Sequence, residues 1–279
     1  MHTTVSDGTD TPSEILSRVR DAGLDLFAVT DHDAIRGCSA VISARREGDP
    51  HFLCGAEFST RDEGGKYHIL GYGYDPASAA ILGVVQMGHE LRMNKIRRRI
   101  ELLAETYGFQ FPPEEIRALL ANENPGKPHL GNLMTRLGFT KSKEDAILNY
   151  INKVKLRTEY IRPETAIRGI LFAGGIPVLA HPTYGSGEEL YMGEEMEERL
   201  RHLLEMGIRG VEAYYSGFTM PMQKELLGYA DKYDLYVTAG SDYHGKNKLV
   251  VLGDTNLENA ADAHPGVRRF LMAVSDRII

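Results

Sequence analysis

The sequence contains little cysteine and no long hydrophobic run. Only two of its 279 residues are cysteine, Cys38 and Cys54, and they form neither a disulfide framework nor a Cys-x-x-Cys motif. The most apolar stretch, residues 170–180, is too short to cross a bilayer and is interrupted by two glycines and Pro177. The first residues lack the basic and then apolar pattern of a signal peptide. These absences predict a cytoplasmic protein without a membrane segment.

Excess positive charge and the common nucleophile motifs are also absent. The formal net charge is −7, so a nucleic-acid substrate would have to bind a local basic patch. There is no Gly-x-Ser-x-Gly motif, no Walker-type loop ending in Lys-Ser or Lys-Thr, and no Gly-x-Gly-x-x-Gly motif. No serine nucleophile or phosphate-binding loop is indicated, and nothing points to a stable protein partner.

One stretch, residues 24–33, combines a buried strand with a polar end. It reads Leu-Asp-Leu-Phe-Ala-Val-Thr, ends in Asp31, His32 and Asp33, and follows the helical pattern of residues 13–22. Two carboxylates beside an imidazole are costly to bury unless they are paired or bind a metal. In barrels of parallel strands, chemistry is located at this end of the strands. A helix-capping role for either aspartate is the alternative.

Similar strands recur along the chain and alternate with helices. Strand patterns occupy residues 52–57, 67–74, 176–181, 210–213 and 235–242, and helical patterns occupy 163–173, 194–206 and 220–232. This alternation predicts an α/β fold with a parallel sheet or barrel. It fails at residues 88–160, where helical patterns separated by prolines predict a helical insertion.

Residues that commonly bind metals gather at the predicted strand ends. They are His2, Asp7, His32, Glu57, His68, His181, Asp242 and His244. Imidazole and carboxylate together are the ligands that zinc, manganese and iron prefer. Each residue alone could be a turn, salt-bridge or strand residue, but their joint position at six strand ends favours a metal site.

The motifs that carry these residues resemble, in the same order and over nearly the whole chain, those of the PHP (polymerase and histidinol phosphatase) superfamily of metal-dependent phosphoesterases. They are His-Thr-Thr-Val-Ser-Asp-Gly at 2–8, Thr-Asp-His-Asp at 30–33, Gly-Ala-Glu at 55–57, His-Ile-Leu-Gly at 68–71, Ala-His-Pro at 180–182 and Gly-Ser-Asp-Tyr-His at 240–244. The chain is most similar to the TrpH-like branch, which acts on 3′,5′-bisphosphonucleotides and the 5′ ends of short RNAs. The resemblance implies a distorted seven-stranded (β/α) barrel, formed by residues 1–87 and 161–279, with residues 88–160 inserted as a substrate-capping domain.

The resemblance also implies two or three divalent Mn, Zn or Fe ions per chain. The first would be held by His2, Glu57 and Asp242, the second by Glu57, His68 and His181, and the third by Asp7, His32 and His244. The family motif begins with a further histidine and a strand that precede Met1, and this chain lacks both. We therefore expect a truncated first strand, mobile residues before Val5, a His2 open to displacement, and one metal bound more weakly than the others.

Such a centre would hydrolyse a phosphate ester with a hydroxide that bridges the metals, and no protein nucleophile would be needed. His244 or Asp33 is the candidate catalytic acid for the leaving group. Arg92, Lys95 and Arg99 fall on one face of a helix, which could also be a solvated basic face. The resemblance adds an Arg-x-Asn and a Lys-Pro-His motif, so the predicted substrate-binding residues are Arg92, Asn94, Lys127 and His129. Tyrosines that could stack on a base are Tyr160, Tyr214 and Tyr215.

Two alternatives remain open. A histidinol-phosphate phosphatase is disfavoured by Asp7, which stands where that branch tends to have histidine, and by the long insertion. A metal-binding remnant without activity is suggested by the missing first histidine. The leading prediction is a phosphoesterase that acts on a small phosphorylated nucleotide or a short RNA.

Overall fold

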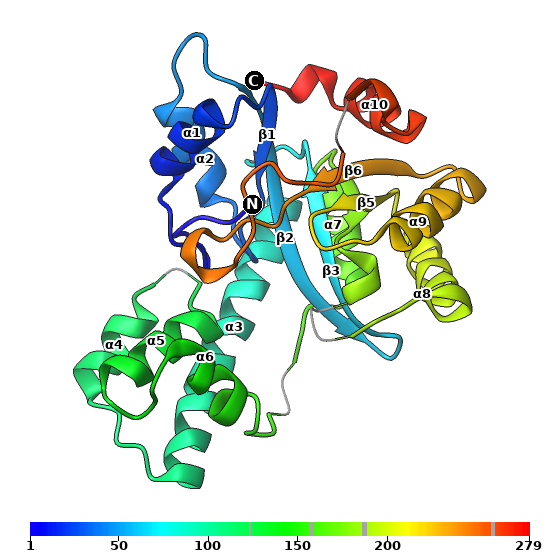
Figure 1. Cartoon of the computed structure of the whole chain (residues 1–279). Helices are drawn as coiled ribbons and strands as arrows, with labels where there is room; N and C mark the ends of the chain where they lie inside the picture. Colours follow the sequence, from blue (N-terminus) through cyan, green and yellow to red (C-terminus); the bar gives the residue numbers. More distant parts are fainter. Residues whose placement is uncertain (123, 157–158, 186–188, 258–259) are drawn as a thin grey trace.

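The computed structural model describes residues 1–279 except 123, 157–158, 186–188 and 258–259, and its centre is a curled mixed sheet (Figure 1). Six strands are found among the described residues, in the order β1-β2-β3-β4-β5-β6. They are β1 (Leu26–Val29), β2 (His51–Asp62), β3 (Gly65–Tyr72), β4 (Ile176–Leu179), β5 (Gly210–Tyr215) and β6 (Tyr236–Gly240). The prediction of an α/β fold is confirmed.

The sheet is parallel except around β3. Strand β3 pairs antiparallel with both β2 and β4, whereas β1 with β2, β4 with β5, and β5 with β6 are parallel. Strands β2 and β3 are joined by Glu63 and Gly64 alone, so they form a hairpin and leave no room for a crossover helix. The prediction of a wholly parallel sheet is wrong at this hairpin.

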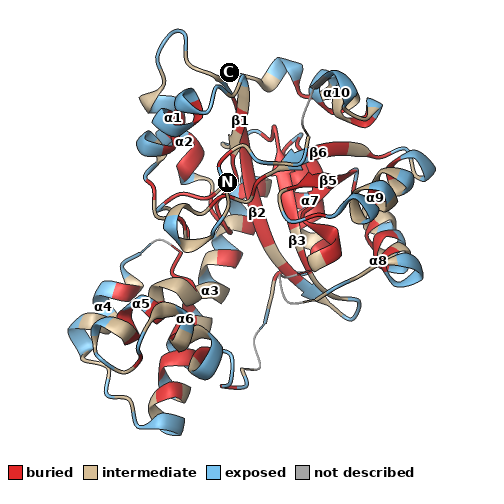
Figure 2. Cartoon of the chain, in the orientation of Figure 1, coloured by how far each residue is buried: buried red, intermediate tan, exposed pale blue. Residues whose placement is uncertain are grey.

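In the described ranges, six α-helices lie around the sheet. They are α1 (Pro12–Asp21), α2 (Arg36–Ala44), α7 (Pro163–Phe172), α8 (Gly193–Met206), α9 (Met220–Lys232) and α10 (Pro265–Ala273). The apolar faces of the first five form the main core with the strands, whereas α10 buries Phe270 in a smaller core against β2, β3 and β4. Figure 2 shows the strands as the most continuously buried part of the chain. Within the described residues, none of the helices combines the length and apolar character needed to cross a bilayer.

The segment between β3 and β4 is helical, as predicted. It contains α3 (Ala79–Tyr107), α4 (Pro113–Leu120), α5 (Lys127–Arg136), α6 (Lys143–Ala146) and a π-helical turn (Ile147–Ile151), and it projects from the sheet as a separate lobe (Figure 1). Positions 123 and 157–158 of this segment lie outside the described residues.

Helix α3 connects the sheet to this lobe. Ser78 caps its first turn, and Gly108 ends it at a φ of 72°, which glycine adopts without strain. The first half buries Ile81 and Val84 in the main core, and the second half buries Leu103 in a second core that belongs to the lobe. The predicted boundary at residue 88 therefore falls inside one continuous helix.

The N-terminal segment lies between the two edges of the sheet. Strands β1 and β6 do not pair, but the Thr30 N–H donates to the Met1 carbonyl and the His2 N–H donates to the Tyr243 carbonyl, both at 2.8 Å. The described strands thus number six rather than the expected seven, and the sheet is an open half-barrel. His2 is fully buried, so the expectation of a displaced His2 is wrong.

Candidate metal centre

The strand ends converge on Glu57 of β2. His32 follows β1 and forms an isolated parallel bridge with Glu57, supported by a 2.8 Å hydrogen bond from the Asp33 N–H to the Glu57 carbonyl. Because β1 and β2 are parallel and in register from Leu26 to Val29, the two residues emerge side by side at the carboxyl end of β1. The Glu57 side chain is almost completely buried.

The Glu57 carboxylate contacts three histidines. Its Oε2 lies 3.0 Å from His2 Nε2, and its Oε1 lies 2.6 Å from His68 Nδ1 and 3.2 Å from His181 Nε2. His68 Nδ1 and His181 Nε2 are also 3.2 Å apart. Asp242 Oδ1 completes one side of the cluster at 3.2 Å from His2 Nε2.

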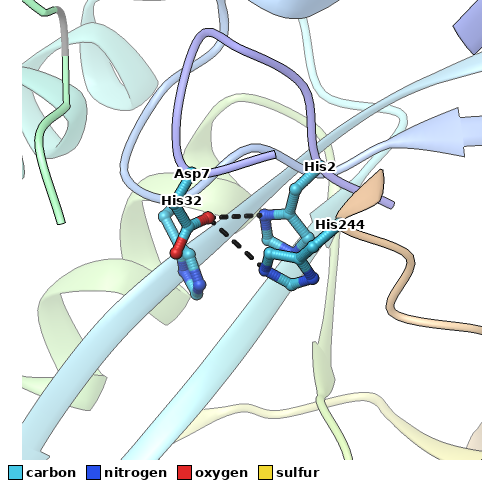
Figure 3. A group of neighbouring side chains, drawn as sticks. All are labelled: His2, Asp7, His32 and His244. Carbon is cyan, nitrogen blue, oxygen red and sulfur yellow. Dashed lines mark ion pairs between the residues drawn. The ribbon is translucent and has the colours of Figure 1, made fainter. Parts of the chain in front are cut away.

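A second group surrounds Asp7 (Figure 3). The Asp7 Oδ1 atom lies 3.8 Å from His2 Nδ1 and 3.4 Å from His244 Nε2, and the rings of His2 and His244 stack with centroids 4.0 Å apart. His32 lies on the other side, with its ring centroid 4.5 Å from that of His2. One ligand atom from each of these four residues lies within 4.8 Å of the others.

All eight predicted ligands therefore lie in one cluster. The structure brings together His2, Glu57 and Asp242 in one group and Asp7, His32 and His244, with His2, in another. Glu57, His68 and His181 form a third set by their mutual contacts. The structure also groups His32 with Glu57 and His68. The prediction had placed His32 in a different ligand set from these two residues.

The donor atoms of the cluster fit a metal. Within the described part of the chain, four buried atoms of this cluster have no hydrogen-bond partner: His2 Nε2, Asp7 Oδ1, His32 Nδ1 and His181 Nδ1. Buried polar atoms are normally satisfied, so each needs an explanation. His2 Nε2 lies close to two carboxylates but without hydrogen-bonding geometry, as a shared metal ligand would. Imidazole nitrogens with carboxylate oxygens are the donor set of first-row transition metals.

The charges of the cluster are strongly coupled. Burial lowers the pKa of His2, but the nearby Asp242 and Glu57 carboxylates outweigh burial and raise this pKa to about 10. Burial lowers the pKa of His32 to about 3. Burial opposes ionisation of Glu57, yet the surrounding histidines, His32 first, hold its pKa well below the ordinary value. The carboxylate is therefore charged at neutral pH, as a metal ligand must be.

Three site residues have strained backbones. Asp33, His181 and Asp242 have φ angles of 50°, 27° and 51°, which non-glycine residues rarely adopt. Each such conformation costs about 1–3 kcal/mol and is retained only where the surrounding structure enforces it. All three follow a strand, β1, β4 or β6. The bent backbone directs His181 and Asp242 into the cluster, whereas the Asp33 side chain is directed toward Arg92.

A pocket opens beside the metal ligands. Its volume is about 270 Å³, and it is lined on one side by Asp7, His32 and His68. The other side is formed by the helical lobe and the hairpin, and its cationic residues are Lys66, Arg92, Lys95, Arg99 and Lys127. The predicted basic face of α3 therefore lines the pocket.

Arg92 and Lys127 line this pocket, whereas the other two predicted substrate-binding residues do not lie in its wall. Arg92 forms an ion pair with Asp33, whose other oxygen accepts the Ser59 N–H at 3.0 Å. Asn94 is exposed on α3 and accepts a hydrogen bond from Arg97. His129 accepts the Gly126 N–H through Nδ1 at 3.1 Å, so it caps the first turn of α5.

Sequence reasoning missed Lys248 and Glu212. The Lys248 ammonium contacts Asp242 Oδ2 and lies 2.7 Å from the Tyr215 hydroxyl. Glu212 is buried on β5, and burial raises its pKa to about 7. Lys248 lies in a loop without a motif. Glu212 lies near the end of the strand pattern of residues 210–213, and this position was the one sequence feature that could have indicated a site residue.

Comparison with known proteins identifies the family of the chain. Residues 1–262 match the PHP domain family, so the chain belongs to this family. Three relatives align over most of their length: a 3′,5′-nucleoside bisphosphate phosphatase of Chromobacterium violaceum, a 5′-3′ exoribonuclease of Haemophilus influenzae and a phosphoribosyl 1,2-cyclic phosphate 1,2-diphosphodiesterase of Eggerthella lenta. Their identities are 27%, 27% and 28%, and the alignments cover 100%, 90% and 88% of this chain and 96%, 91% and 93% of the relatives.

A solved structure shows the same fold. A proposed metal-dependent phosphoesterase from Bifidobacterium adolescentis superposes with a TM-score of 0.83 at 28% identity, covering 98% of this chain and 94% of that one. The prediction that the chain is an enzyme of the metal-dependent phosphoesterase class is confirmed.

Proposed function

We propose that this enzyme removes a phosphate from a nucleotide that carries a second phosphate, as a 3′,5′-bisphosphonucleotide does, or from the 5′ end of a short RNA. The main support is the position of the cationic pocket beside the cluster of metal ligands. A phosphate at the metals would leave the rest of the substrate inside this pocket. The names of two relatives agree with these substrates.

The residues that would hold the metals are the eight of the cluster, and we propose two or three Mn, Zn or Fe ions. Bound ions would activate a water for attack and neutralise the phosphoryl oxygens. The protein contributes the arrangement: Glu57 is shared between the group of His2 and the pair of His68 and His181. One carboxylate thereby fixes the spacing of two sets of ligands.

The second phosphate is assigned to the inner wall of the pocket. Arg99 is only 8% exposed, and its Nε has no hydrogen-bond partner among the residues that the structure describes. Lys95 lies over the ring of Tyr160 at 3.9 Å from the centroid, so this tyrosine contacts a cation in the structure. Burial lowers the pKa of Lys95 and Arg99, and repulsion by the positive charge of Arg92 lowers the pKa of each further. Buried cations that repel one another are expected where an anion binds.

The helical lobe would cap the substrate, as predicted for residues 88–160. Arg92, Lys95 and Arg99 all come from α3, and Lys127 comes from the start of α5. For the leaving group, His244 remains the proposed proton source, whereas Asp33 does not, because both of its carboxylate oxygens accept hydrogen bonds. The Asp33 carboxylate is held by Arg92 and Ser59, so it also positions the Arg92 guanidinium at the pocket.

The test is a comparison of substrates with purified, metal-analysed protein. Adenosine 3′,5′-bisphosphate, a short 5′-phosphorylated RNA, phosphoribosyl 1,2-cyclic phosphate, histidinol phosphate and an aryl phosphate are assayed side by side, with the Glu57→Gln variant as the control for contaminating phosphatases. We expect the bisphosphate or the RNA to give a kcat/KM at least about tenfold above the others, the effect of one charge-assisted contact. Preference for histidinol phosphate or the cyclic ester, or no hydrolysis by metal-loaded protein, would contradict the proposal.

A further inference from the structure

We propose that Glu212 is a positioning residue, whose carboxylate holds the backbone of His181 so that the His181 ring is directed at Glu57. The proposal rests on the metal centre proposed above, since His181 is one of its ligands. Glu212 itself belongs to none of the groups of candidate metal ligands.

The sheet register brings the two residues together. In the parallel pair β4 and β5, Val178 is opposite Gly210 and Leu179 is opposite Val211. The next residue of β5 is Glu212, and it therefore lies beside the point where β4 ends. There its Oε2 accepts the His181 N–H at 2.8 Å, in a fully buried hydrogen bond.

This hydrogen bond acts on a strained residue. His181 has a φ of 27° and a ψ of 55°, and it precedes Pro182, which disfavours helical backbone conformations in the preceding residue. In this conformation the ring reaches Glu57 Oε1 and His68 Nδ1, both at 3.2 Å. By accepting the His181 N–H, the Glu212 carboxylate stabilises the backbone conformation that places the His181 ring beside Glu57.

A glycine on the neighbouring strand makes room for the carboxylate. A Cβ atom at Gly240 of β6 would lie 2.0 Å from Glu212 Oε1 and 3.0 Å from its Cδ. Gly240 does not have a positive φ, so its glycine is explained by space and not by backbone conformation. The position of the Glu212 carboxylate thus depends on the absence of a side chain at Gly240.

An ion pair does not account for the burial of Glu212. In the part of the chain that the structure describes, no ion pair of Glu212 is found, and the residue is only 4% exposed. A buried carboxylate without a cation is unfavourable unless its hydrogen bonds compensate. The hydrogen bond from the His181 N–H offsets part of this cost.

The first experiment measures hydrogen exchange in the metal-free protein. In Glu212→Leu and Glu212→Gln, the His181 amide should exchange faster relative to the Ala180 amide, which donates to the His68 carbonyl at 3.0 Å and reports on opening of the sheet. Leu should have the larger effect because Gln keeps an acceptor oxygen. A merely structural role for Glu212 would speed both amides equally and would overturn the proposal.

The matched control is Thr238→Val. Thr238 is the register partner of Glu212 on β6 and is buried to a similar degree. Its hydroxyl has no hydrogen-bond partner among the described residues, His181 included. The substitution should leave the ratio of the two exchange rates unchanged. Metal titration then separates the variants: Glu212→Leu should weaken the binding of one metal by about 10–100-fold, the range for residues that orient a ligand, and Thr238→Val should not.

The second experiment uses Gly240→Ala, which keeps Glu212 but displaces its carboxylate. It should weaken the same metal, and it should add little further loss when combined with Glu212→Ala, which removes the clash. Additive losses in the double variant, or normal metal affinity in both single variants, would overturn the proposal. If the wild-type chain binds no metal, the proposed function fails, whereas the exchange experiment still tests the link between Glu212 and His181.

Discussion

The Glu57 carboxylate separates His2 from His68, with Oε2 3.0 Å from His2 Nε2 and Oε1 2.6 Å from His68 Nδ1. Each oxygen of one buried side chain thus faces a different set of candidate metal ligands. Because His2 comes from the N-terminal segment and His68 from β3, this single residue links parts of the chain that are far apart in sequence.

Replacing Glu57 by Gln should therefore damage the centre more than losing one histidine. A neutral amide cannot neutralise two cations, so both neighbouring metals should bind more weakly, each by more than the roughly 100-fold that changes outside the ligand set produce. Metal content after dialysis is compared between Glu57→Gln and His32→Ala. Equal or higher occupancy in the Glu57 variant would contradict its bridging role.

Arg92→Ala and Lys127→Ala should weaken the binding of the substrate beyond the reacting phosphate. Each change removes one charge-assisted contact, so KM for adenosine 3′,5′-bisphosphate should rise roughly 10–100-fold while KM for a small aryl phosphate changes little. Arg97→Ala, on an exposed part of the same helix, is the control. Equal losses with both substrates would mean that these residues support the fold or the metal centre instead.

The pH dependence of substrate binding should report on Lys95. Burial lowers the pKa of its ammonium to about 8. Below this pH Lys95 is charged and can bind a phosphate, and above it the charge is lost. The ratio of kcat/KM for the bisphosphate to kcat/KM for an aryl phosphate should therefore fall as the pH rises through about 8.

The matched variant for this test is Lys95→Arg, which stays charged across the range because the pKa of arginine is above about 12. It should keep the ratio constant from pH 7 to 9.5, while Lys95→Met should show a low ratio throughout. A fall that persists in Lys95→Arg would assign the titration to another group.

The ligand cluster could be foreseen in part from sequence because several of its ligands end or follow a strand pattern. His32, Glu57 and His181 come after apolar runs whose ends must meet in any parallel sheet, so their convergence follows from topology. The helical lobe was predictable for a related reason, since residues 88–160 have helical spacing without strand patterns. Both features could be predicted because the spacing of apolar residues within a short segment already distinguishes strands from helices.

The remaining features depend on contacts between distant residues. The antiparallel placement of β3 follows from a two-residue turn that could equally have been a loop. The hydrogen bond between Glu212 and the His181 backbone needs the β4–β5 register, and the ion pair of Asp33 with Arg92 needs the docking of α3. His129 looked like a substrate ligand by motif, but its ring caps α5, a local use that the motif does not reveal.

The last prediction compares the hydrophobic core of the helical lobe with the main core around the sheet. Leu103 is fully buried in the core of the helical lobe, and Leu200 is fully buried in the main core on α8. Truncation of either to alanine should cost about 2–5 kcal/mol of local stability through a cavity. If the lobe caps the substrate as a separate unit, the two variants should differ in where that loss appears.

In Leu103→Ala, hydrogen exchange should accelerate in the second half of α3 and in α4 and α5, and KM for the bisphosphate should rise, while metal content stays normal. In Leu200→Ala, exchange should accelerate around α8 and the strands of the sheet, with the lobe protected. These outcomes are expected if the lobe holds the substrate and the sheet holds the metals. Uniform acceleration over the whole chain in Leu103→Ala, or loss of metal with it, would show that the lobe and the sheet form one cooperative unit instead.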